Sequence, residues 1–552
     1  TRLGIPVIVA SNSRNENDRV TFDDRDRTTS FTAWPGTLGI AATGDLDVVK
    51  EFAETGRKEW NATNIRKGYM YMADTATDPR WYRITETFGE HPDFISKVME
   101  TVIEAYQGEE LGEDSIALTI KHFPGGGARE NGFDPHYEEG KYNVCPTPGS
   151  LEKYHLPPFI AAIKKQPSSI MPYYAIPSNN KSASPQAPFD GPFEEVGFAY
   201  NKGFITDLLR EKLGFKGYVN SDTGILTKMA WGVEKLTEAE RVARALAAGT
   251  DLISGHNEIA PFKDAYEQGL LTEEMIDRTA KRLLKEMFAL GMFENPYRDP
   301  EVADQVVNTE ESRKLAYKAH QKSVVLLKNK DNLLPLTPEK LTGKKVYVEL
   351  FMKTLNEEEL ERQKMTGITL DSRELMAQFS ERMKAAYPDI TFIDDYHEAD
   401  YALLFLEPKS GFYFKATDDY LELNIGEETG IDLEKIKSIR TTVPKVIINI
   451  DIDLPWILTN IEPLADCLLA GFNTFARATM DIILGKFNPT GKLPLTLPAG
   501  DEVIAVDENG ICASPNDVPG YDKHKYMDGK EYAYRDEKGN QYKYGFGLRY
   551  EE

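Results

Sequence analysis

Two stretches of sequence decide the fold: residues 115–127, SIALTIKHFPGGG, and residues 214–226, GFKGYVNSDTGIL. Each is an apolar run that ends in polar residues at a glycine-containing turn. Outward from them, between residue 4 and about residue 290, short apolar runs alternate with longer segments that repeat apolar residues three and four apart. Repeated strand–helix units produce this alternation, so the sequence predicts a (β/α)8-type barrel in the α/β class.

The expected barrel elements can be placed by residue number. The pattern predicts strands at 4–10, 68–73, 115–121, 169–174, 217–221 and 251–254, and helices at 93–106, 201–213, 237–248 and 272–290. Few residues precede the first of these strands. The sequence therefore leaves open whether the barrel is complete, opened, or closed by another element.

A second unit is expected after the break NPYRDP at 295–300. Apolar strands at 345–351, 401–406, 445–450 and 466–470, with helical stretches between them, favour a doubly wound α/β sandwich domain. The predicted organisation is a barrel over 1–295, a linker over 296–320, the sandwich domain over 321–500 and a C-terminal extension over 501–552. The extension has little periodicity and should consist of loops with short strands.

Composition excludes several classes of function. The 552 residues have a formal net charge of -24, which repels nucleic acid and anionic membranes, so a neutral or cationic small molecule is the expected partner. Three widely spaced cysteines and eight histidines without ligand spacing indicate no disulfide framework, no metal site and no cofactor. No apolar run is long enough to cross a bilayer. Because the sequence opens with Thr1, a leader has been lost if one existed, and the compartment stays undetermined, with a secreted or periplasmic location slightly favoured.

Polar residues at the strand ends are the candidates for chemistry, because the carboxyl ends of barrel strands meet on one face. Asp222 directly follows an apolar strand and precedes Gly224, a position suited to a nucleophile. A helix-capping or turn carboxylate is the alternative interpretation. Lys121 and His122 end another strand before three glycines, where backbone can approach a ligand closely.

Three motifs in order give a specific resemblance. KHFPG at 121–125, GFKGYVNSD at 214–222 and DPRWYRITETFGEHP at 78–92 resemble family 3 glycoside hydrolases. The likeness continues through KSVVLLKNKDNLLPL at 322–336, GKFNPTGKLPLTLP at 485–498 and YKYGFGL at 542–548, so it covers most of the chain.

The resemblance implies a retaining, exo-acting β-glycosidase, most specifically a β-glucosidase. Asp222 would attack the anomeric carbon and form a covalent glycosyl-enzyme intermediate. The residues implied to hold the terminal sugar are Arg83, Lys121, His122, Met171 and Tyr174. Tyr174 is also expected to donate to the carboxylate of Asp222, and the positive charges of Arg83 and Lys121 should keep that carboxylate ionised.

Two positions depart from the family pattern. Asn12 stands where relatives often have an aspartate that grips two sugar hydroxyls, and an amide gives up the charge-assisted bonds of a carboxylate. Thr223 follows the nucleophile where tryptophan is common, which predicts a more open site for the leaving group.

The acid/base position is the largest departure from the family pattern. The family usually takes a glutamate from the second domain, but Phe412 and Lys415 occupy the matching places, leaving Glu407, Asp418 and Asp419 as nearby candidates. The other candidate is the pair Asp134 and His136, which resembles the Asp-His dyad of the N-acetylglucosaminidase branch, although its spacing from KHFPGGG is about two residues longer. A histidine that only closes a loop or binds substrate is the alternative.

Competing functions remain open at this point. β-Xylosidase and β-N-acetylhexosaminidase are the nearest enzymatic alternatives, and a sugar-binding protein that has lost catalysis is the alternative from another class. A nucleotide-binding second domain is disfavoured because no G-x-G-x-x-G follows its strands. The tyrosine-rich extension suggests a homodimer in which it covers a neighbour's site.

Overall fold

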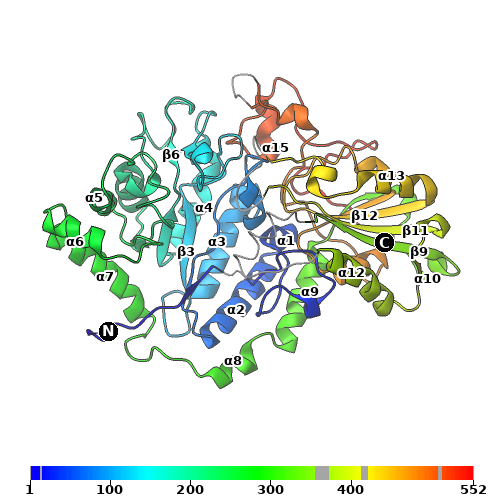
Figure 1. Cartoon of the computed structure of the whole chain (residues 1–552), viewed down its shortest axis with the longest axis horizontal. Coiled ribbons are helices and arrows are strands. Elements are labelled where there is room, and N and C mark those ends of the chain that lie inside the picture. Colours follow the sequence, from blue (N-terminus) through cyan, green and yellow to red (C-terminus); the bar gives the residue numbers. More distant parts are fainter. Residues whose placement is uncertain (1, 13–14, 355–371, 412–420, 508–511, 551–552) are drawn as a thin grey trace.

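The computed structural model describes residues 2–12, 15–354, 372–411, 421–507 and 512–550. Two α/β units lie side by side, the blue-to-green part of the chain forming one and the yellow strands the centre of the other (Figure 1). The predicted α/β barrel followed by a doubly wound domain is confirmed. Among the described helices, none has both the length and the apolar character that crossing a membrane requires.

The first unit is built on a parallel sheet with the strand order β1-β2-β3-β5-β7. The strands are β1 Ala10–Ser11, β2 Lys67–Gly68, β3 Ala117–Phe123, β5 Ser169–Pro172 and β7 Tyr218–Val219. A parallel bridge from Asn220 to Leu252 adds the segment 251–254 as a sixth position. Within the described residues the ladder runs from β1 to Leu252 without joining its two edges. The fold is therefore a barrel that stays open between these edges.

Several barrel strands are shorter than expected. The run at 4–10 pairs only from its end, because Arg66 and Lys67 both donate to the Val9 carbonyl and β2 offers no earlier partner. The segment 251–254 forms an isolated bridge instead of the expected strand. Apolar runs mark where a strand can form, whereas the neighbouring strand decides where the ladder begins and ends.

Helices cover the sheet, and most match the expected ranges. The helical elements of this unit are α1 Thr37–Ala42, α2 Leu46–Ala62, α3 Pro92–Gln107, α4 Pro157–Lys164, the π-helix η6 Gly203–Lys212, α5 Glu238–Ala248, α6 Ala260–Glu267 and α7 Glu273–Ala289. A two-sided capping box between Thr237 and Glu240 begins α5, and Gly249 in the left-handed region ends it.

The segment expected to be a linker is mostly helical. It contains α8 Pro300–Val306 and most of α9 Glu310–Ser323. Helix α9 contacts α1, α2 and α14 (Ala476–Ile483), and the buried ring of His320 bonds to the Ala33 carbonyl at 3.1 Å and stacks on Phe475. This helix is therefore a packed connection between the two units, and its burial could not be read from the proline-containing break before it.

The second unit has a six-stranded sheet in the order β10-β9-β11-β12-β13-β8. Its elements are β8 Val325–Asn329, α10 Pro338–Leu341, β9 Lys345–Met352, α12 Ser372–Ala386, β10 Thr391–Ile393, β11 Tyr401–Glu407, α13 Leu433–Thr442, β12 Lys445–Asp451 and β13 Cys467–Gly471. The four expected strands lie within one or two residues of β9, β11, β12 and β13. Antiparallel β8 and the edge strand β10 were not expected.

The C-terminal extension packs against its own chain. It is mostly irregular, as expected, with the short helix α15 Gly520–Lys523 near the top of Figure 1. The buried carboxylate of Asp517 accepts bonds from the Thr147 backbone and hydroxyl and from the Ser150 hydroxyl. The ring of Tyr521 stacks on His91. These tyrosine-rich residues are engaged within the chain, and the homodimer stays a prediction.

Candidate active site

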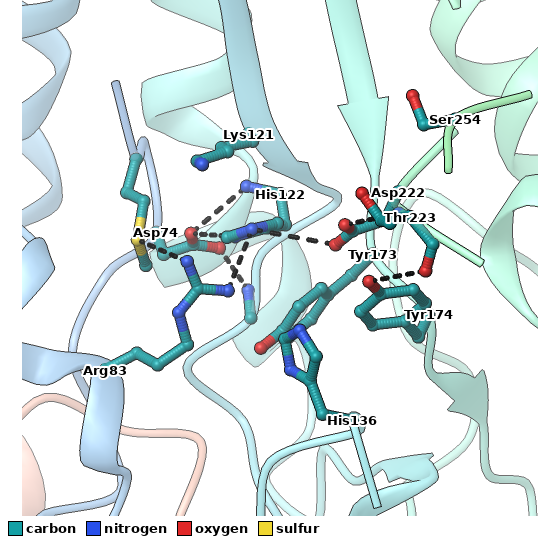
Figure 2. Close-up of polar contacts among 12 residues, drawn as sticks. Asp74, Arg83, Lys121, His122, His136, Tyr173, Tyr174, Asp222, Thr223 and Ser254 are labelled. Carbon is teal, nitrogen blue, oxygen red and sulfur yellow. Dashed lines mark hydrogen bonds and ion pairs between the residues drawn. The ribbon is translucent and has the colours of Figure 1, made fainter. Parts of the chain in front are cut away.

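The candidate residues meet at the carboxyl ends of the barrel strands (Figure 2). Lys121 and His122 belong to β3, Met171 to β5, and Asp222 follows β7. Asn12 follows β1, as its sequence position predicts. Parallel strands bring residues that are distant in sequence to one edge of the sheet. Here the register places Lys121 directly beside Met171.

Asp222 has one oxygen held and one oxygen available. Its Oδ1 accepts a 2.7 Å bond from the Thr223 backbone N–H, whereas its buried Oδ2 has no hydrogen-bond partner in the structure. Nε2 of His122 lies 3.8 Å from Oδ2. A fixed carboxylate with an unshared oxygen beside a site is the arrangement that a nucleophile requires.

His122 is oriented by two groups that fix its ring. Its Nε2 lies 3.1 Å from Nη1 of Arg83, and its Nδ1 lies 2.9 Å from Oδ2 of Asp74. Because a guanidinium can only donate, Nε2 is the acceptor and Nδ1 carries the proton that bonds to Asp74. The ring is therefore neutral in this arrangement.

Asp74 was missed at the sequence level, although it directly follows the expected strand 68–73. Its carboxylate is fully buried and also accepts from the backbone N–H groups of His122 and Gly126. Burial raises the pKa of Asp74 to about 7, against the lowering effect of these bonds and of Arg83. Asp74 binds Nδ1 of His122, the ring nitrogen away from Asp222, so it is a positioning residue.

Two cations lie on the far side of His122 from Asp222. Nη2 of Arg83 pairs with Oε2 of Glu86 at 2.9 Å, and Nζ of Lys121 donates to Oδ1 of Asn12 at 2.9 Å. Arg83 is fixed by the short helix η2 Tyr82–Glu86. Burial would lower the pKa of Arg83, but Glu86 and other nearby negative charge raise it, so this residue stays charged.

Asp134 and His136 form the predicted pair. Nδ1 and the backbone N–H of His136 both contact Oδ1 of Asp134. The other oxygen of Asp134 accepts from Nε1 of Trp81 at 2.9 Å and from the Tyr173 hydroxyl at 2.5 Å. Burial alone would raise the pKa of Asp134, but the charge and hydrogen bond of His136, followed by Arg83, lower it well below the ordinary value.

Tyr173 lies between His122 and the Asp134–His136 pair and was also missed at the sequence level. Its ring lies 4.3 Å from the His122 ring, while its hydroxyl holds Asp134. Its neighbour Tyr174 was chosen from sequence, and the ring of Tyr174 meets the His136 ring edge to face at 4.9 Å. The sequence did place Tyr173 at the end of an expected strand. It could not show which way the side chain points, because that depends on the turn that follows the strand.

Tyr174 contacts the turn that carries Asp222. Its hydroxyl donates to the Thr223 carbonyl at 2.8 Å. Burial, and then the nearby charge and hydrogen bonding of the Asp222 carboxylate, raise the pKa of Tyr174, so its hydroxyl keeps its proton. Tyr174 therefore holds the turn that carries the nucleophile, and it lies close enough to Asp222 for the expected contact with the carboxylate.

The acid/base candidates from the second domain are only partly described. Glu407 ends β11, is 2% exposed and lies 3.7 Å from Nζ of Lys409. Burial raises its pKa to about 8. Asp418, Asp419, Phe412 and Lys415 lie outside the described residues. Across the described part of the chain no group of three or more His, Cys, Asp or Glu residues could hold a metal ion.

Comparison with known families explains this constellation. Residues 1–285 match the glycosyl hydrolase family 3 N terminal domain, and residues 324–550 match the glycosyl hydrolase family 3 C-terminal domain. The chain belongs to glycosyl hydrolase family 3. The predicted membership and the glycoside hydrolase class are therefore confirmed.

Family 3 relatives match over most of the chain. A probable β-glucosidase C of Aspergillus flavus is 35% identical over 91% of this chain and 74% of its own length. A periplasmic β-glucosidase/β-xylosidase of Dickeya chrysanthemi is 30% identical over the same shares, 91% and 74%. The solved family 3 structure of a β-glucosidase from Listeria innocua in complex with glucose has a TM-score of 0.71 at 24% identity, over 100% of this chain and 72% of the other. That likeness shows the fold.

Proposed function

We propose that this family 3 enzyme is a retaining, exo-acting β-glucosidase with Asp222 as its nucleophile. The observation that carries the proposal is the unshared Oδ2 of Asp222, which faces His122 at 3.8 Å while Oδ1 is held by backbone. The β-glucosidase names of the relatives at 30–35% identity favour glucose as the terminal sugar. β-Xylosidase activity is the second candidate, because the Dickeya relative carries both names.

The proposed first step forms a covalent intermediate. An oxygen of Asp222 attacks the anomeric carbon, the bond from that carbon to the leaving oxygen breaks, and the leaving oxygen takes up the proton of the acid/base residue. Arg83, Lys121 and His122 would bind the ring hydroxyls.

The proposed second step returns the enzyme to its starting state. A water molecule gives one proton to the acid/base residue, and its oxygen bonds to the anomeric carbon as the bond to Asp222 breaks. We assign the acid/base role to His136, with Asp134 as the residue that orients its ring. The side chain of His136 is 26% exposed, so it can exchange protons with solvent, whereas that of Asp134 is 1% exposed.

The same local geometry occurs once more among the described residues, which gives the assignment a reference. Asp395 and His397 in the second domain make the same pair of bonds, with the backbone N–H and Nδ1 of the histidine on one carboxylate oxygen. Their side chains are 67% and 62% exposed. The Asp-x-His spacing alone therefore produces the bond, and the support for catalysis comes from the site around Asp134.

The experiment compares wild type with Asp222→Asn on p-nitrophenyl β-glucoside, β-xyloside and β-N-acetylglucosaminide. We expect kcat on the preferred substrate to fall at least a thousandfold in the variant, because the amide cannot act as the nucleophile. Asp277→Asn, at an exposed position of α7, is the matched control and should retain activity. The proposal is wrong if Asp222→Asn keeps wild-type kcat.

The same measurement separates the alternatives. The sugar released fastest names the activity among glucosidase, xylosidase and hexosaminidase. Glucose binding by calorimetry without hydrolysis of any of the three would instead support a sugar-binding protein. The periplasmic location in the name of the Dickeya relative supports a periplasmic or secreted location for this chain as well.

A further inference from the structure

A pocket of about 480 Å³ lies where the two units meet. Its wall comes from the barrel unit, except for Asn473, which follows β13 of the second unit. Its lining includes Asn12, Ser30, Phe31, Thr37, Glu86 and Asn473. The volume is of the size that accommodates a small molecule such as a sugar.

The pocket adjoins the sugar site through two direct contacts. Asn12 in its wall is the partner of Lys121, at 2.9 Å, and Glu86 in its wall is the partner of Arg83, also at 2.9 Å. Lys121 and Arg83 are the two cations proposed to bind the terminal sugar. The pocket therefore borders the sugar site at Asn12 and Glu86.

The position of Asp222 decides which end of the sugar meets the pocket. In Figure 2, Asp222 lies on one side of His122, and Arg83 and Lys121 lie on the other. In a pyranose ring, C4 is opposite the anomeric carbon, and C5, which carries C6, is next to C4. A ring with its anomeric carbon at Asp222 and its far end at Lys121 and Arg83 therefore places its C4 and C6 hydroxyls near Asn12 and Glu86, the partners of those two cations.

The lining suits a hydroxyl-rich ligand. Asn473 is 9% exposed, and its Oδ1 has no hydrogen-bond partner. Its φ of 54° is left-handed, and its backbone N–H is held at 2.6 Å by Asp451, so the backbone that carries this side chain is fixed in place. A buried acceptor without a donor is costly unless a ligand or water supplies one. The half-buried Phe31 ring adds an apolar wall of the kind that sugar sites use.

We propose that this pocket binds a second sugar unit joined to O4 or O6 of the terminal glucose, so that the enzyme also releases intact disaccharides from β-linked glycosides. The inference rests on the proposed β-glucosidase function and extends it by a second sugar position beside Asn12 and Glu86. The bond that breaks is the same one, between the inner sugar's anomeric carbon and the leaving group. Water supplies the hydroxyl, as in the hydrolysis of a single glucose.

The test follows the first products formed from p-nitrophenyl β-cellobioside and β-gentiobioside, which carry the outer glucose on O4 and O6. Chromatography with mass detection should show intact disaccharide appearing together with p-nitrophenol from the first turnovers of at least one substrate. The proposal is overturned if both substrates release only glucose and p-nitrophenyl β-glucoside first.

A blocking variant ties that result to the pocket. Ser30 is exposed at the lining, so Ser30→Trp should fill the pocket without disturbing a buried contact. We expect the ratio of kcat/KM for disaccharide release to kcat/KM for p-nitrophenyl β-glucoside to fall at least tenfold. Thr441→Trp, at the exposed end of α13, should leave the ratio unchanged. An unchanged ratio in Ser30→Trp would place the disaccharide elsewhere and overturn the proposal.

Different results would reject the disaccharide pocket and the β-glucosidase function. If p-nitrophenyl β-glucoside is cleaved but no disaccharide is released, the pocket assignment is wrong and the β-glucosidase function stands. If wild type cleaves no glycoside, the proposed function is wrong, and calorimetric titration with cellobiose, gentiobiose and glucose decides the pocket. Tighter disaccharide binding that Ser30→Trp weakens would support the pocket, and equal binding of all three sugars would reject it.

Discussion

Asp134 and Asp395 show how surroundings give one of two similar residues a different chemistry. Both accept two bonds from a histidine two positions later, but Asp134 is buried and also accepts from Trp81 and Tyr173. Four donors on one carboxylate keep it ionised and fixed, and a fixed carboxylate holds the His136 ring in one orientation. The exposed pair in the second domain has no such support.

For the single residue His136, we predict that the His136→Ala substitution reduces activity more on substrates with poor leaving groups than on substrates with good ones. A general acid matters most when the departing oxygen is strongly basic, so kcat/KM for an alkyl β-glucoside should fall about 10²–10⁴-fold. The 2,4-dinitrophenyl β-glucoside, whose leaving group departs without a proton, should lose much less in the same step. Steady-state kinetics of both substrates measure the difference.

His397→Ala is the matched control for that experiment, because it removes a histidine with the same local bonds on the exposed surface of the second unit. It should behave as wild type on both substrates. Equal or negligible losses on both substrates in His136→Ala would return the acid/base role to the second domain, where Glu407 is the described candidate.

The loop after η2 is one of the elements that join the barrel unit to the C-terminal extension. Glu90 in this loop is buried, and its carboxylate accepts from the Thr496 hydroxyl at 2.6 Å and from the backbone N–H groups of Gly520 and Tyr521 at 3.0 and 3.1 Å. Burial raises the pKa of Glu90 to about 7, although these bonds oppose the shift. The folded protein therefore binds a proton here more tightly than the unfolded chain does.

The expected consequence is a pH-dependent stability. Between the ordinary glutamate pKa, near 4.5, and about 7, the folded state holds more protons than the unfolded state, so the free energy of unfolding falls as pH rises and levels off above 7. The contribution of this group is at most about 3 kcal/mol across that range. Glu90→Gln cannot titrate, so its stability curve should be flatter over the same interval.

Denaturant unfolding at pH 5, 6, 7 and 8 measures this effect as the difference between wild type and variant at each pH. Glu110→Gln, an exposed position of the same unit, should follow wild type across the series. A constant difference between wild type and Glu90→Gln at all four pH values would show that Glu90 does not titrate in this range.

Over the whole molecule, the extension returns from the second unit and binds the barrel loops that carry the site. Leu548 pairs with Leu326 of β8, whereas Asp517, some thirty residues earlier, is buried against Thr147 and Ser150 of the barrel unit. Helix α9 makes a second connection between the units. The relative position of the two units, and with it the pocket at Asn473, depends on these packed connections.

We therefore predict that Asp517→Ala destabilises the protein as a whole. Three buried donors would lose their acceptor, which should lower the free energy of unfolding by about 2 kcal/mol or more. Thermal unfolding followed by tryptophan fluorescence reports the change, and Glu537→Ala, an exposed residue of the same extension, is the control. A midpoint equal to that of the control would mean that the extension does not hold the barrel loops.

The sequence by itself determined the order of elements and much of the site. Continuous apolar runs marked β9, β11, β12 and β13 within one or two residues, because strands buried on both faces need apolar residues at every position. The polar ends of the runs at 115–121 and 217–221 led to Lys121, His122 and Asp222, since the residues after barrel strands lie on one face.

Only the tertiary structure decided how these residues are held and what surrounds them. Asp74 and Tyr173 gained their roles from strands that are adjacent in space, and α9 became a packed connection where the sequence suggested a linker. The pocket between Asn12 and Asn473 likewise joins residues from two units. Local sequence encodes the period and the ends of an element, but hydrogen-bond partners, burial and the pKa of a carboxyl group depend on which distant elements pack around it.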